Sequence, residues 1–111
     1  MSADTVVVFY GAQVALKEEE VSACEARSHP LMKAAREAKL DSYWADFVPH
    51  DDHGFELIVG RRFGAFGLED SLEAHIERGT VTLAMESVDG FLARVGLPCP
   101  GKLIVRFHQD L

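Results

Sequence analysis

The sequence has few of the residues that cross-link a chain covalently or through a metal, and no long apolar run that would anchor it in a membrane. Its two cysteines, Cys24 and Cys99, are far apart and form no CxxC spacing, so neither a disulfide framework nor a cysteine-ligated metal is expected. The longest apolar run, Val6 to Tyr10, is far shorter than the roughly 18 residues that a membrane span requires. The first five residues contain no Lys or Arg and no apolar export segment. We therefore expect a cytoplasmic protein that does not enter a membrane.

Basic residues are also scarce. The chain carries 11 Lys and Arg against 18 Asp and Glu, which gives a formal net charge of -7. Apart from the pair Arg61 and Arg62, the cations are dispersed among acids, whereas a nucleic-acid site needs them gathered on one face. Nucleic-acid binding is therefore not expected, and an acidic surface fits a protein partner with a basic patch better.

What the sequence does have is enough apolar material for a core. At 111 residues and 48% hydrophobic residues, residues 1–111 are expected to form a single domain that folds without metal or disulfide support. No repeats or low-complexity tracts divide it.

The spacing of apolar residues predicts the order of elements. Residues 5–16, 42–48, 55–62 and 102–108 have the β-branched, aromatic or alternating character of strands. Residues 17–40 are expected to form one helical arm, which is either a kinked helix or two short helices with Pro30 at the first position of the second. Ser87 is expected to cap a helix that ends at Gly96. Between them, residues 63–85 are interpreted as a variable insertion with a short helix near 70–79, although Val81, Leu83 and Met85 also alternate as a strand would.

Without that insertion, the order is strand, helix, strand, strand, helix, strand. This order predicts an α+β domain of the ferredoxin-like split βαββαβ type, with a four-stranded antiparallel sheet and helices on one face. Because side chains alternate along a strand, each strand can then be divided between the two faces. The residues expected toward the helices are Tyr43, Ala45, Phe47, Phe55, Leu57, Val59, Leu103, Val105 and Phe107.

The opposite, open face is predicted to be unusually apolar. Its candidate binding residues are Trp44, Val48, Glu56, Ile58, Ile104, Arg106 and His108. An exposed face of this composition is typical of an interaction surface. We expect it to be covered by a protein partner, with a second copy of the chain as the favoured partner, or by residues 63–85 folded back.

Two groups of residues are candidates for a small-molecule site or a metal site. On the open face, His108, Arg106 and Asp46 could line a small-molecule cavity, with His108 carrying protons and Arg106 holding an anion. In the turn after residue 48, His50, Asp52 and His53 are potential metal ligands, but consecutive residues seldom converge on one ion and a hydrated turn is the favoured interpretation. The spacing of Gly60, Gly64 and Gly67 matches no phosphate-binding loop. No cofactor is expected.

The sequence therefore favours a small binding or regulatory module, homodimeric through its apolar sheet face. The alternative is a small enzyme or ligand-binding protein with a cavity on that face, so whether the chain catalyses a reaction stays open.

Overall fold

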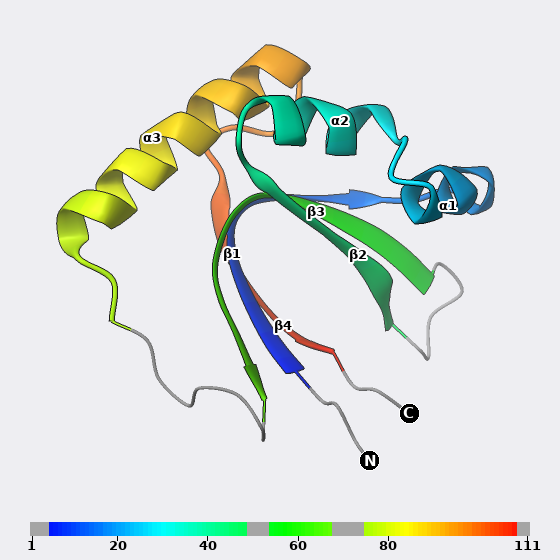
Figure 1. Ribbon diagram of the computed structural model, residues 1–111, viewed down its shortest axis with the longest axis horizontal. Helices are drawn as coiled ribbons and strands as arrows, with labels where there is room; N and C mark the ends of the chain where they lie inside the picture. Colours follow the sequence, from blue (N-terminus) through cyan, green and yellow to red (C-terminus); the bar gives the residue numbers. More distant parts are fainter. Residues whose placement is uncertain (1–4, 49–53, 68–74, 109–111) are drawn as a thin grey trace.

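A computed structural model describes residues 5–48, 54–67 and 75–108 (Figure 1). The elements in chain order are β1 (Thr5–Ala15), α1 (Glu18–Glu25), α2 (Pro30–Glu37), β2 (Asp41–Val48), β3 (Gly54–Gly67), α3 (Arg78–Val95) and β4 (Lys102–His108). Within the described residues the strands form one sheet in the order β2-β3-β1-β4, and each neighbouring pair is antiparallel. The predicted α+β class and four-stranded antiparallel sheet are confirmed.

The helical arm forms where it was predicted. Glu20 in the first turn of α1 accepts a hydrogen bond from the backbone N–H of Lys17, at 2.9 Å. Pro30 occupies the first position of α2, and His29 caps this helix by accepting the backbone N–H of Leu31 at its Nδ1. Because Nδ1 is an acceptor, the proton lies on Nε2, which donates to Glu20 Oε2 at 3.0 Å. The Lys17 N–H and then His29 hold the pKa of Glu20 below its usual value.

All the helices cover one face of the sheet. The core on this side joins Cys24 of α1, Ala35 of α2 and Phe91 of α3 to sheet residues that include Tyr10, Ala12, Leu57 and Val59. The helices do not cover this face evenly, because α2 packs over β2 and β3 while α3 packs mainly over β1 and β3. The outer strand β4 is left with little helical cover.

The prediction for residues 63–85 was wrong. β3 continues to Gly67, and the residues from Arg78 onward belong to α3, so Gly79 lies near the start of a helix and Ser87 in its middle. Residues 68–74 lie outside the described part of the chain. The alternation of Val81, Leu83 and Met85 is coincidental: the buried stripe of the helix runs through Ala84, Val88, Phe91 and Leu92.

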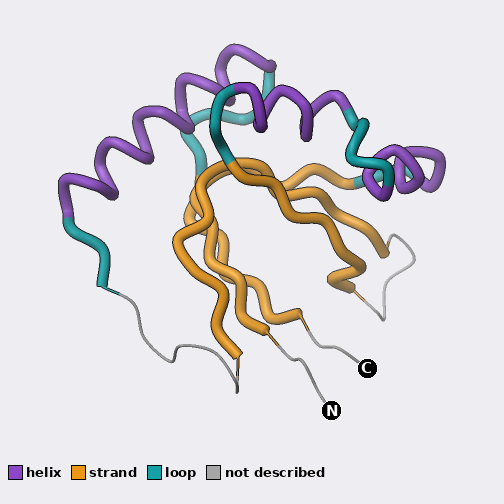
Figure 2. Tube along the Cα trace, in the orientation of Figure 1, coloured by secondary structure: helices purple, strands orange, loops and turns teal. Residues whose placement is uncertain are grey.

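The sheet is strongly bent, and its second face is also buried. Figure 2 shows all four strands curving along their length. The concave side holds a second cluster of buried residues, which we call the inner cluster: Val7, Phe9, Ala45, Ile58 and Ile104. Its members are 0–8% exposed, although none of the described helices packs against them. The curvature brings β2 and β4 into contact across this face, which contributes to its burial.

A pair of glycines lies within the β1–β3 ladder. Gly11 and Gly60 are opposite one another in the β1–β3 ladder. A Cβ on Gly11 would lie 1.9 Å from the carbonyl oxygen of Val59, and a Cβ on Gly60 would lie 2.1 Å from that of Tyr10. Gly60 also has φ +151°, which side-chain-bearing residues rarely adopt. Only glycine at both positions allows the two backbones to approach this closely.

Candidate functional site

The prediction that Trp44 lies on the open face of the sheet was wrong. Trp44 packs on the helix side, against the main core and with its ring centroid 6.0 Å from that of Phe55. Tyr43 and Ala45, predicted to face the helices, instead pack with the inner cluster on the concave side. Aromatic residues occupy both parities of this strand, so alternation alone could not decide its orientation. The remaining helix-facing prediction for β2, Phe47, has no described side chain.

Several predicted open-face residues do lie on the concave side, but they are not freely accessible. Ile58 is fully buried and Ile104 is 8% exposed. Glu56 and Arg106 are half-buried and form an ion pair, with Arg106 Nη2 3.0 Å from Glu56 Oε1. That oxygen is buried and makes no well-aligned hydrogen bond, so the contact is an ion pair only.

The other predicted site residues lie outside what the structure describes. The side chains of Asp46, Val48 and His108 belong to this group, as do residues 49–53 with the potential metal ligands His50, Asp52 and His53. Among the described residues, no group of three or more His, Cys, Asp or Glu side chains is placed to hold a metal ion.

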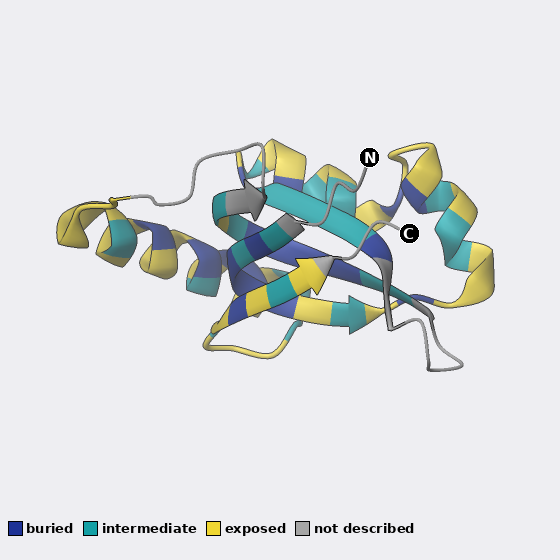
Figure 3. Ribbon diagram, turned by 90° about the horizontal axis from the view of Figure 1, so that it is seen from below, coloured by how far each residue is buried: buried dark blue, intermediate teal, exposed yellow. Residues whose placement is uncertain are grey.

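The exposed apolar surface is on the helix side of β4 rather than on the concave face. Leu103, Val105 and Phe107 were correctly placed on the helix side but are 65%, 59% and 56% exposed. Figure 3 shows exposed and more buried residues alternating along this strand. On β1 the neighbours of Val105 and Phe107 on the same face are Val8 and Val6, which are half-buried. We call these five residues the β4 apolar surface.

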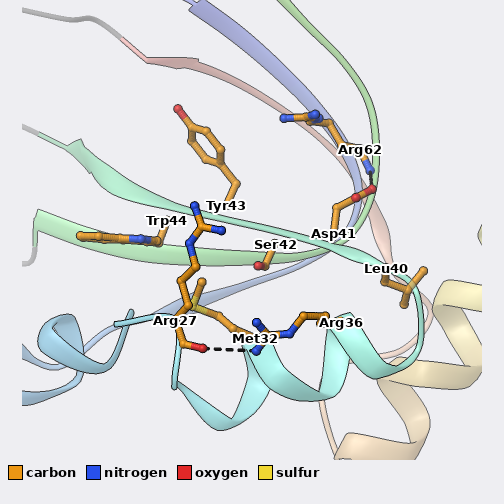
Figure 4. A pocket seen from close by; sticks show the side chains of 9 residues that line it. All are labelled: Arg27, Met32, Arg36, Leu40, Asp41, Ser42, Tyr43, Trp44 and Arg62. Atoms are coloured by element: carbon orange, nitrogen blue, oxygen red, sulfur yellow. Dashed lines mark hydrogen bonds between the residues drawn. The ribbon is translucent and has the colours of Figure 1, made fainter. Parts of the chain in front are cut away.

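A groove runs along the opposite edge of the sheet, beside β2 (Figure 4). Its volume is about 500 Å³, and its walls come from the α1–α2 corner, α2, β2 and β3. The lining residues are Arg27, Met32, Arg36, Leu40, Asp41, Ser42, Tyr43, Trp44 and Arg62. Because Tyr43 and Trp44 point to opposite faces of β2, the groove extends over the strand edge.

The groove is basic although the chain is acidic. It is lined by three guanidinium groups and one carboxylate, that of Asp41. This carboxylate is already engaged: its Oδ2 accepts the backbone N–H of Arg62 at 2.9 Å and lies 3.6 Å from Arg61 Nη1. Sequence reasoning missed this site because Arg27, Arg36 and Arg62 are far apart in the chain and only the fold brings them together.

Asp89 connects α3 to the sheet through hydrogen bonds. Asp89 Oδ1 accepts hydrogen bonds from Tyr10 Oη and from the backbone N–H of Gly101, both at 2.8 Å. Burial and then the Asp89 carboxylate raise the pKa of the Tyr10 phenol. Both partners of the carboxylate oxygen come from the protein itself, so we interpret this group as structural.

No helix in the described part of the chain is both long and apolar enough to cross a membrane. Comparison with protein-family models, with curated proteins and with solved structures finds no match for this chain. Function must therefore be inferred from the two surfaces described above.

Proposed function

We propose that the protein is a small binding module that acts as a homodimer, with the β4 apolar surface as its contact between copies. The proposal also keeps the split βαββαβ interpretation, because β2-β3-β1-β4 is the order obtained when each helical crossover skips one strand. The observation that carries the proposal is the exposure of Leu103, Val105 and Phe107, three large apolar side chains on one strand face.

The area involved fits an association surface. These three side chains expose on the order of 300 Å² in total, which is already the size of the largest apolar patch on a typical monomer. The half-buried Val6 and Val8 and the backbone edge of β4 extend it toward the roughly 800 Å² per partner of a standard interface. At about 25 cal/mol per Å², each 100 Å² of this apolar area that the second copy removes from water contributes about 2.5 kcal/mol toward the cost of association.

A second copy fits this strand because β4 is a sheet edge. A strand paired with itself about a twofold axis is necessarily antiparallel, and such closed symmetry does not propagate into filaments. An axis through Val105 would place Leu103 of one copy opposite Phe107 of the other. The exposed side chains would then pair across the junction on one face of a continuous sheet.

The test is the oligomeric state of untagged protein, measured by sedimentation equilibrium over a range of concentrations. We expect a dimer, and we expect the double variant Leu103→Lys/Phe107→Lys to raise the dimer dissociation constant by more than about a thousandfold, because four apolar side chains are lost from the contact. The matched control is Leu83→Lys on α3, where the leucine is 69% exposed but lies away from β4.

Wild-type protein that stays monomeric at all soluble concentrations would contradict the proposal. So would a dimer that Leu83→Lys disrupts and the β4 variant leaves intact. Circular dichroism of each variant separates loss of association from loss of folding.

A further inference from the structure

The groove beside β2 presents more positive charge than its own residues neutralise. We propose that it binds a small organic anion, in which a carboxylate or phosphate group is joined to a flat apolar group. The inference does not depend on the homodimer, because no residue that lines the groove belongs to the β4 apolar surface.

Arg27 and Arg62 would bind the anionic group. In Figure 4 Arg27 extends from the α1–α2 corner and Arg62 from β3, and both point into the space beside Tyr43. Within the described part of the chain, no carboxylate lies in ion-pair distance of either guanidinium. Guanidinium groups bind carboxylates and phosphates through two parallel hydrogen bonds, which makes them the side chains best suited to such a ligand.

The backbone of Arg27 is held in a conformation that favours glycine. Arg27 has φ 57° and follows α1 at the position where helices commonly end on glycine, and α3 ends in this way on Gly96. The Ser28 N–H bonds back to the Ala23 carbonyl, and the Arg27 carbonyl accepts a hydrogen bond from Arg36 Nη2 at 3.3 Å. A residue with a side chain costs about 1 kcal/mol of backbone strain at this position. Arg27 nevertheless occupies it, and its side chain lines the groove.

Trp44 and Met32 would hold the apolar group. Trp44 lines the groove and packs beside Phe55, yet it stays half-exposed. Met32 on α2 is also half-exposed and lines the same groove. The volume of about 500 Å³ falls in the range of small-molecule sites. A lining that combines three guanidinium groups with aromatic and apolar side chains suits a ligand that is charged at one end and apolar at the other.

The test uses Trp44 as a reporter, because it is the single tryptophan of the chain. Tryptophan fluorescence is titrated with phenyl phosphate and benzoate, with inorganic phosphate and phenol as probes that carry only one end of the ligand. We expect saturable changes with the first two and at least tenfold weaker responses with the others. Phenyl phosphate or benzoate, whichever binds more tightly, identifies the preferred anionic group.

The decisive variant is Arg27→Gly, which removes the guanidinium and suits the backbone conformation, so folding is retained. We expect it to weaken binding about ten- to a hundredfold, the loss of one charge-assisted pair. Lys39→Gly is the matched control, because Lys39 is also a cation at a helix end with φ 60° but does not line the groove. It should bind like the wild type.

Three results would overturn the proposal. The first is an unchanged fluorescence signal with both phenyl phosphate and benzoate. The second is equal weakening by Arg27→Gly and Lys39→Gly, which would indicate attraction to net charge without a site. The third is binding of inorganic phosphate as tight as that of phenyl phosphate, which would leave the aromatic wall without a role.

Discussion

Replacing Gly11 with alanine tests whether the close approach of β1 and β3 fixes the curvature of the sheet. The new methyl carbon would lie 1.9 Å from the carbonyl oxygen of Val59 and 2.9 Å from Cα of Gly60. Both are backbone atoms in a paired ladder, so no side-chain rotation relieves the overlap. The strands must separate, and the bend that buries the inner cluster must open. We expect a loss of about 3 kcal/mol or more in the free energy of unfolding.

Urea denaturation followed by circular dichroism measures this loss as a lower midpoint. The matched control is Gly90→Ala on α3, where the added carbon would meet no atom within 4 Å. This change should stabilise the protein by up to about 1 kcal/mol, because alanine is the better helix former. A Gly11→Ala variant as stable as the wild type would refute the idea that backbone contact sets the curvature.

Two further predictions concern titrating groups. Tyr10→Phe removes a hydrogen bond to Asp89 and should lower the free energy of unfolding by about 1 kcal/mol. Because the pKa of Tyr10 is raised on folding, the phenol stabilises the fold below pH ~10, and this stabilisation is lost as pH rises through the folded-state pKa. Thermal melts of the variant should therefore show a weaker loss of stability in alkali than those of the wild type. The pKa of Glu20 is lowered on folding, so its contribution is present above the unfolded pKa of about 4.3 and is lost as pH falls through the folded value. Glu20→Gln should therefore reduce the slope of stability against pH in acid, and a slope identical to that of the wild type would argue against the contacts with Lys17 and His29.

Local patterns predicted local structure well. The acidic first turn after Lys17 and the proline at position 30 fixed the helical arm, and the strict alternation in residues 102–108 fixed the last strand with its observed bounds. In each case the signal lies in neighbouring residues and requires no knowledge of the rest of the fold.

The errors arose where distant parts of the chain decide the outcome. Leu103, Val105 and Phe107 look like core residues, and only the path of α3 over β1 and β3 leaves them exposed. The concave face looked like an open surface because no sequence pattern reports curvature, although glycine inside a strand marks a bend and Gly11 was overlooked. Arg27 gave no signal either, because its φ of 57° normally selects glycine.

The inner cluster has a consequence for engineering. None of the described helices packs against it, and its shape depends on strands whose backbones are in close contact at Gly11 and Gly60. Truncating Phe9, the largest fully buried side chain of that cluster, would therefore leave a hollow that the surrounding strands cannot easily close. Such a hollow, lined by Val7 and Ile58, would be dry and apolar, and a designer could load it with a molecule the size of benzene.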